Sequence, residues 1–398
     1  MTTKNCLHEP GTARCDTLLQ RLHGLDAVRS GALLLGIVLH SLLPFTDIVW
    51  MINDSERSIV ALWISGTIHL FRMALFMLLA GYFGRMVTLR RGSGSYFRDR
   101  AKRILLPAVV FWPFTVIPLG LLAMYGASVR GLPAPMASEP TSPLMMFTPG
   151  QLWFLLVLFE IATLVLLARA VLLRFLGAER VGRAAARIGE ILSHPAGVLL
   201  PALVFVAALL LQGGEPAGGI IAPTTIIPEA ASTLGYLGAF VTGWFLHASP
   251  GSMRRIARNW LPMLALGLIA TVVVWFPGVP REAVMVAVAL AGWLLGFGLL
   301  GAAVRFLDRE HTWIRYLADA SYWMYLVHLP LLVLFEIPLA DLGWPILVKL
   351  LLTWAVTTAV LLITYELLVR HTWLGAWLNG RRYPRRARRS GGDGEGTG

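Results

Sequence analysis

Charged side chains are scarce in this chain. Only 14% of its 398 residues are Asp, Glu, Lys or Arg, whereas 57% are hydrophobic. Soluble domains carry about 25% charged residues, and the mean hydropathy of +0.68 lies well outside their ordinary range. This composition excludes an ordinary soluble protein and predicts an integral membrane protein.

Cysteine is nearly missing as well. The two cysteines, Cys6 and Cys15, both precede the first apolar run, so the chain has no disulfide framework and a reduced, cytosolic N-terminus is compatible with it. The first 25 residues contain no apolar core and no evident cleavage site. We therefore expect no secretory signal peptide, and targeting would fall to the first apolar run itself.

The short motifs that hold nucleotides or metals are also missing. The sequence contains no Walker motif, no dinucleotide-binding glycine fingerprint and no zinc-ligand spacing. We therefore expect no bound cofactor and no metal site. Any nucleotide-containing substrate would have to be recognised by looser means.

Long apolar runs dominate what is present. Ten of them are long enough, or nearly so, to cross about 30 Å of hydrocarbon as helices. They lie at about residues 27–49, 59–84, 104–126, 150–173, 195–212, 232–247, 260–276, 283–304, 316–338 and 344–369. The predicted fold is an all-α integral membrane bundle of about ten transmembrane helices, forming one domain over 26–370. The flanks would be a cytosolic N-terminal segment, 1–25, and a basic tail, 371–398, which we predict to be disordered and attracted to anionic lipid.

The basic residues indicate how the bundle is oriented. Most of the 34 Lys and Arg residues lie in alternate loops, and the intervening loops hold only Arg57, Arg130 and Arg281. By the positive-inside rule this places both termini in the cytoplasm and requires an even number of spans. The same alternation explains the net charge of +12 without nucleic acid as a partner. On this topology 127–149 and 213–231 are the only outer loops long enough to shape an opening to the outside.

Arg29 and His40 stand out in the first span. Eleven residues at about 100° each come within about 20° of three full turns, so both side chains share one face and lie about 16 Å apart along the axis. The arginine would lie near the cytosolic surface and the imidazole near the bilayer midplane. A midplane histidine can act as a general base. A structural histidine that bonds to a neighbouring helix is the alternative that the spacing leaves open.

Two more spans carry polar side chains at depth. The second span holds His69 and Arg72 one turn apart, and they could line the cavity of His40 or, for Arg72, pair with Glu160 of the fourth span. The ninth span holds Tyr322, Tyr325 and His328; the tyrosines could serve only in packing, but a third midplane histidine favours a site. Charged residues nearer span ends, namely Lys349, Glu336 and Glu366, are explained by snorkelling towards the membrane surface.

A surplus of basic residues follows the second span. The predicted cytosolic loop 85–103 contains seven Lys and Arg and one acid, Asp99, which exceeds the need of topology. Arg100, Lys102 and Arg103 are candidates for binding the phosphates of a cytosolic ligand, because guanidinium groups bind phosphate in a bidentate manner.

Five short motifs, in order, resemble those of the acyltransferase-3 family of membrane O-acyltransferases, and within it the glucan biosynthesis protein C type. They are Arg29 with His40, the Phe-Met-Leu-Leu-Ala-Gly-Tyr-Phe run at 76–83, the Arg-Ala-Lys-Arg-Ile-Leu-Leu-Pro run at 100–107, Gln-Leu-Trp-Phe-Leu at 151–155, which contains Trp153, and Ser-Tyr-Trp-Met-Tyr-Leu-Val-His at 321–328. Ala80 replaces the usual serine of the second motif, so any role of that hydroxyl is missing here.

The resemblance implies a reaction. It implies transfer of an acyl group, succinyl or acetyl, from cytosolic acyl-CoA to a hydroxyl of a periplasmic or envelope glucan, by a multi-pass protein of the inner membrane. His40 would be the general base, Arg72 or His69 would stabilise the oxyanion, and Arg29 would hold the donor. A transporter or exporter of an anionic, lipid-linked glycan is the alternative, in which the same histidines and arginines form a pathway.

Overall fold

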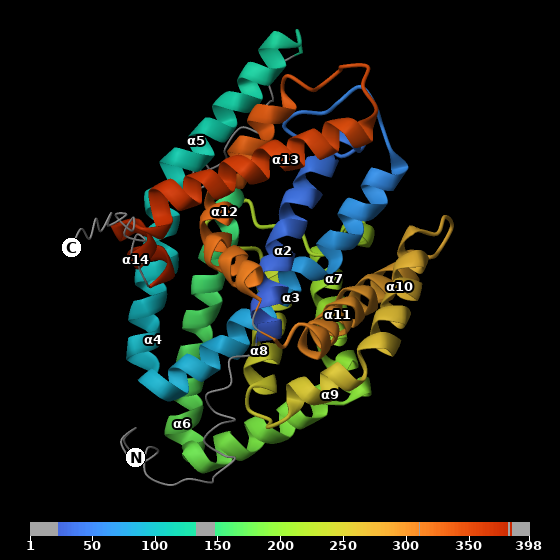
Figure 1. The fold of residues 1–398 in the computed structure, drawn as a ribbon. Helices are drawn as coiled ribbons and strands as arrows, with labels where there is room; N and C mark the ends of the chain where they lie inside the picture. The colour runs from blue at the N-terminus through green and yellow to red at the C-terminus, as the bar shows by residue number, and fades with distance from the viewer. Residues whose placement is uncertain (1–22, 133–147, 310, 381–382, 384–398) are drawn as a thin grey trace, which may run out of the picture.

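The computed structural model describes residues 23–132, 148–309, 311–380 and 383, and within these ranges it contains helices and no strand. Figure 1 shows them as a bundle of long helices that cross at varied angles. The α-helices are α2 (His23–Leu42), α3 (Ile59–Arg91), α4 (Ser93–Arg100), α5 (Leu106–Val129), α6 (Trp153–Ser193), α7 (Leu199–Gln212), α8 (Ala230–Leu246), α9 (Ser252–Arg258), α10 (Trp260–Trp275), α11 (Arg281–Phe306), α12 (Thr312–Glu336), α13 (Ile346–Thr364) and α14 (Trp373–Asn379). Below, the outer end of the bundle means the end with the α2–α3 and α7–α8 connections, following the predicted orientation.

The helices have the length and composition of membrane spans. In the described part of the chain eight are long and apolar enough to cross a bilayer, and α9 with α10 makes a ninth if this pair, bent by 65°, is one span. The remaining predicted span is α8, an apolar helix of 17 residues. The predicted all-α polytopic membrane bundle is confirmed. Both terminal segments on which the cytoplasmic orientation depends, 1–22 and 384–398, lie outside the described residues, as do the two cysteines.

Small residues allow the central helices to approach closely. A Cβ on Gly81 of α3 would collide with the carbonyl of Phe240 on α8, and a Cβ on Gly243 of α8 would collide with the carbonyl of Leu78 on α3. Each helix thus fits its backbone against a glycine of the other, which is how helices gain van der Waals contact in lipid, where burial from water contributes little.

Two predicted cytosolic loops are helical instead. The segment 169–187 continues α6 as far as Ser193, across one break at Gly177, whose φ of 78° interrupts the helix. The basic segment 85–103 belongs to the end of α3, to α4 and to the π-helical turn Ala101–Leu105. The arginines therefore sit on an ordered, bent helical segment, because Gly92 with φ 83° turns the chain between α3 and α4.

The first span ends earlier than predicted. We expected it to run to Val49, but α2 ends at Leu42 and only a 3-10 turn with Pro44 follows. Residues 46–58 form a loop at the outer end. Its apolar residues Ile48 and Val49 made the start of this loop look like a continuation of the span. The predicted disordered tail also needs correction, because Trp373–Asn379 forms α14 and buries Leu378; the basic part from 384 lies outside the described residues.

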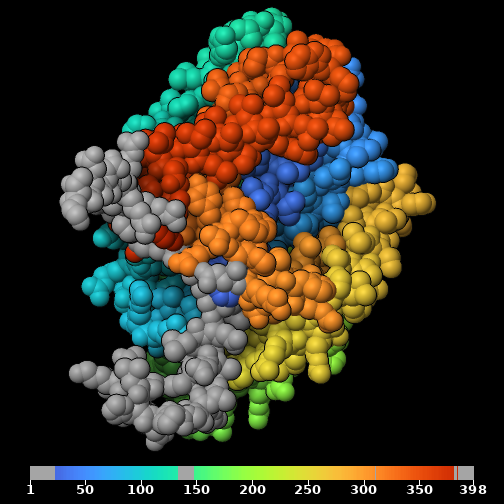
Figure 2. All heavy atoms as spheres, in the orientation of Figure 1, coloured from blue at the N-terminus to red at the C-terminus, as the bar shows by residue number. Residues whose placement is uncertain are grey.

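Helix α13 covers the outer end of α2. Trp354 of α13 donates a hydrogen bond to Ser41 of α2 at 2.5 Å, and in the space-filling view α13 lies across α2 so that only part of α2 stays visible (Figure 2). The snorkelling prediction for Lys349 is wrong. Its side chain is 1% exposed and its ammonium lies 2.7 Å from a carboxylate oxygen of Asp54, itself 3% exposed.

Candidate functional site

A cavity of about 840 Å³ runs between α2, α3, α6 and α12. Arg29, Arg100 and Arg103 line its cytosolic end, and His40, in the last turn of α2, lines it nearer the outer end. The lining ends at residues of the outer connections, 148–151 and 222–224. One cavity thus reaches from the basic helical segment to both outer loops that were predicted to shape an opening.

Two of the three predicted histidines meet in this cavity. The sequence placed His40 near the bilayer midplane, but the structure places it in the last turn of α2, near the outer end of that helix. The ring centroids of His40 on α2 and His328 on α12 are 5.5 Å apart. Nδ1 of His328 lies 2.8 Å from the carbonyl oxygen of Tyr325. A carbonyl only accepts, so Nδ1 carries the hydrogen, and Nε2 of a neutral His328 is left as an acceptor. The sequence named both histidines as candidates for a site, and the structure brings them side by side.

Arg72 lies in the same part of the cavity. Its guanidinium rests against Gly36 of α2, one turn before His40, where any Cβ would displace it. Among the described residues it forms no ion pair, and in particular none with Glu160, which does not line the cavity. The structural pairing considered from the sequence is therefore not what the structure shows. A cation in an apolar bundle without an acid is suited to a site where negative charge develops.

His69 lies elsewhere, contrary to the expectation that it shares the cavity of Arg72. It does not line the cavity, and its Nε2 lies 3.3 Å from the carbonyl oxygen of Ile220 in the α7–α8 connection. One helical turn carries His69 away from Arg72 towards the outer end, against that connection. Through this contact His69 helps to hold the α7–α8 connection.

Three arginines, Arg29, Arg100 and Arg103, line the cytosolic end of the cavity together with the carboxylates of Asp26 and Asp319. Asp99 accepts a hydrogen bond from Arg100 at 2.8 Å and forms an ion pair with Arg103 at 3.0 Å, so one carboxylate orients two guanidinium groups. Arg29 donates to the carbonyl of Ala318 on α12 at 3.1 Å. Lys102 points away, because it is exposed and does not line the cavity.

Three aromatic residues predicted for the site form its wall. Tyr325 donates to the carbonyl of Gln151 at 2.6 Å, and Tyr322 donates to the carbonyl of Arg103 at 2.7 Å. Trp153 lines the cavity and packs on Tyr236 of α8, with ring centroids 5.5 Å apart. The tyrosine hydroxyls are thus used to join α12 to its neighbours.

Two cavity residues were missed from the sequence. Gln151 donates through its amide to the carbonyl of Leu326 at 3.0 Å, and its amide oxygen, buried at the cavity, has no hydrogen-bond partner among the described residues. Its place beside Trp153 in the fourth motif could have indicated it. Trp50 stacks on His40 with ring centroids 5.5 Å apart. No sequence signal indicated Trp50, which lies directly after the span that we expected to end at Val49, in the predicted outer loop.

Metal coordination finds no support in the described part of the chain, where no group of three or more His, Cys, Asp or Glu side chains could hold an ion. The side chains that line the site include imidazoles, guanidinium groups and aromatic rings, with the carboxylates of Asp26 and Asp319 at the cytosolic end. Such a set can transfer protons and stabilise an oxyanion.

Comparison with known proteins gives the family. An acyltransferase domain matches residues 22–367. The chain is similar to glucans biosynthesis protein C of Escherichia coli (strain SMS-3-5 / SECEC), at 31% identity over 146 residues, and to that of Shigella dysenteriae serotype 1 (strain Sd197), at 30%. The aligned stretch covers 36% of this chain and 38% of each relative. No solved structure matches the chain. Since the domain match covers most of the chain, the protein belongs to the acyltransferase-3 family, which confirms the predicted enzyme class.

Proposed function

We propose that this protein transfers an acyl group, succinyl or acetyl, from cytosolic acyl-CoA to a hydroxyl of an envelope glucan. The observation that carries the proposal is the single cavity that joins a basic cytosolic end, a pair of histidines with Arg72, and the outer connections. A donor and an acceptor from opposite sides of a membrane can meet only in such a passage. The name of the two relatives supports a glucan as acceptor, and the multi-pass fold supports the inner membrane as location.

His40 acts as the general base in this proposal. Its imidazole takes the proton of the acceptor hydroxyl while the oxygen attacks the thioester carbonyl. The carbonyl oxygen becomes an oxyanion beside the guanidinium of Arg72, which has no acid partner among the residues that the structure describes. The C–S bond then breaks, and the imidazolium returns the proton to the CoA thiolate. Atoms and charges balance without any further reactant.

The donor enters from the cytosolic end. Arg100 and Arg103 hold the phosphates of acyl-CoA, since guanidinium groups oriented by Asp99 keep free N–H groups for a second anion. Arg29 lies between this end and His40 and holds the pantetheine part. The cavity there is lined by residues of both α2 and α12, such as Arg29 and Ser321.

The acceptor enters from the outer end. The free amide oxygen of Gln151 and Nε2 of His328 are acceptors for sugar hydroxyls, and Trp153 offers an apolar wall. These groups leave the reacting hydroxyl to His40. Saccharides bind in this way, with hydrogen bonds at the edges and an apolar contact at the face.

The test is a His40→Ala variant with His194→Ala as matched control, since His194 is exposed and lies outside the cavity. We expect purified His40→Ala to fold and to lose acyl-CoA consumption by 10²-fold or more, as for the loss of a general base. Mass spectrometry of envelope glucans from cells with each variant would name the acyl group. Acylated glucan at wild-type level from His40→Ala would refute the proposal.

A further inference from the structure

Hydrogen bonds do not explain how the imidazole of His40 is oriented. A catalytic base is usually oriented by a third group that bonds its other nitrogen. Nδ1 of His40 is buried, and no described residue forms a hydrogen bond with it. The imidazole must therefore take its orientation from packing.

The packing partner is Trp50. The indole lies parallel to the imidazole within 14°, at 5.5 Å between centroids, and both rings line the cavity. His328 is a second ring neighbour, at 5.5 Å between centroids and with an interplanar angle of 43°. A stacked neighbour prevents rotation about χ2, because the imidazole would have to turn into the indole face.

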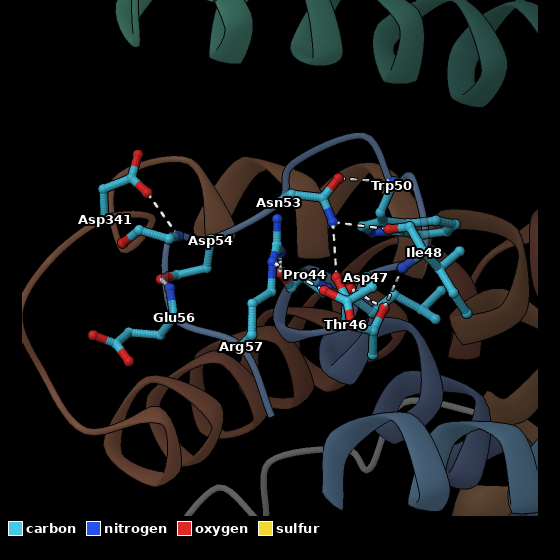
Figure 3. Close-up of polar contacts among 12 residues, drawn as sticks. Pro44, Thr46, Asp47, Ile48, Trp50, Asn53, Asp54, Glu56, Arg57 and Asp341 are labelled. Atoms are coloured by element: carbon cyan, nitrogen blue, oxygen red, sulfur yellow. Dashed lines mark hydrogen bonds and ion pairs between the residues drawn. The ribbon is translucent and has the colours of Figure 1, made fainter. Parts of the chain in front are cut away.

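Trp50 is in turn held by its own loop (Figure 3). The side chain of Asn53 accepts from the backbone N–H of Trp50 at 2.9 Å and donates to the carbonyl of Ile48 at 2.9 Å. Arg130, at the end of α5, donates to the carbonyl of Asn53 and to Asp341. The loop is therefore held by hydrogen bonds within itself, and Arg130 links it to the end of α5 and to the α12–α13 connection.

The strongest fastening is the pair of Asp54 and Lys349. The ammonium and the carboxylate are 2.7 Å apart and almost completely buried. The backbone N–H of Asp54 also donates to the carbonyl of Pro44 at 2.9 Å, so the same residue ties the loop to the end of α2. A buried ion pair is an expensive way to hold a loop unless its position is needed.

We propose that Trp50 is a positioning residue for His40, and that the buried Asp54–Lys349 pair holds Trp50 in place. The inference rests on the proposed role of His40 as base. Trp50 keeps the imidazole in the plane in which its free nitrogen faces the acceptor hydroxyl. Lys349 and Asp54 act at a distance from substrate, through the loop and the indole.

The first experiment compares Trp50→Ala and Trp50→Phe with Trp344→Ala, an exposed tryptophan of the α12–α13 connection, as control. For Trp50→Ala we expect kcat to fall by about 10²-fold, as for a misplaced catalytic group, with an unchanged KM for acyl-CoA. Trp50→Phe keeps a flat ring and should recover most of kcat. Wild-type kcat for Trp50→Ala, or a rise only in the KM for glucan, would overturn the inference.

A second experiment tests the pair. Asp54→Asn combined with Lys349→Met removes both charges and leaves neither buried alone. We expect kcat to fall, as for Trp50→Ala. Adding Trp50→Ala to the double variant should lower kcat little further, because both changes act through the position of the Trp50 ring. Wild-type kcat of the double variant, or losses that multiply, would overturn the role of the pair.

Two further measurements keep the outcomes separate. If the double variant does not fold, Asn53→Ala is measured in its place, because it removes the hydrogen bonds that hold the backbone of Trp50 and Ile48. This variant should lower kcat in the same way. A wild-type kcat would refute the role of the loop in positioning Trp50. His40→Ala is measured beside all of them. An active His40→Ala refutes the proposed function, whereas an inactive His40→Ala with an active Trp50→Ala refutes only the positioning role.

Discussion

Arg72 and Lys349 are two cations inside the same bundle with opposite surroundings. Lys349 is sealed from the cavity and bound to the carboxylate of Asp54. Arg72 lines the cavity, rests against the backbone at Gly36 and has no acid partner among the described residues. A buried charge that depends on its partner destabilises a structure when that partner is lost, whereas a charge kept without a partner beside a cavity is available to a substrate. The comparison separates a structural cation from a functional one.

The largest expected effect is on the structural side. Lys349→Met leaves the carboxylate of Asp54 buried and unpaired, which should lower the free energy of unfolding by about 3–5 kcal/mol. Thermal unfolding of the detergent-purified protein would measure it. The matched control is Lys349→Met with Asp54→Asn, which should recover most of the loss because no charge is left alone.

Loss of the unpaired cation, Arg72, should lower the rate of the reaction and not the stability of the protein. Arg72→Gln keeps a polar side chain of similar length but removes the charge that faces the oxyanion, so kcat should fall by about 10²- to 10³-fold. The melting temperature should stay close to that of the wild type. A variant that loses stability as severely as Lys349→Met would erase the distinction between the two cations.

A smaller effect is expected at the cytosolic end. Arg100→Lys with Arg103→Lys keeps the positive charge that orients the protein but removes the planar fork, so the KM for acyl-CoA should rise, by about tenfold for each 1.4 kcal/mol lost. Arg98→Lys, in the same helical segment but outside the cavity, is the control. An unchanged KM in the double variant would mean that these arginines serve topology alone.

The smallest effect concerns an exposed ion pair at the outer end. Hydrogen bonds and charge from Arg130 hold the pKa of Asp341 below its ordinary value. A lowered pKa means that the stabilisation is present above the pKa of the unfolded state, about 3.9, and is lost as the pH falls through the folded one. Asp341→Asn should therefore lower the melting temperature slightly and equally from pH 8 to 5, with a difference that shrinks only below about pH 4. A difference that vanishes already near pH 6 would contradict this origin.

The helices and much of the cavity could be predicted, because both depend on local patterns. Each predicted span falls on a helix, and the eleven-residue spacing placed Arg29 and His40 on one face that proved to be a cavity wall. The surroundings of the His69 side chain could not be predicted. His69 is only one helical turn from Arg72, yet it faces the α7–α8 connection and not the cavity. Lys349 looked like a snorkelling residue, since its partner, Asp54, lies 295 positions away.

The loop at residues 46–58 shows where sequence reasoning ends. Its first apolar residues continue the hydropathy of α2, so the span was expected to run to Val49, and Trp50 carried no signal of a role. Only Pro44 and the polar contacts of Asn53 and Asp54 explain why the chain leaves the helix there.

The sequence by itself determined the membrane bundle and the family motifs, because hydropathy and helical period depend on neighbours in the chain. Which cation is paired, which histidine meets His40 and which ring orients it were decided only by the tertiary structure. These are contacts between residues far apart in the sequence, and they depend on how the helices rotate and cross when they pack.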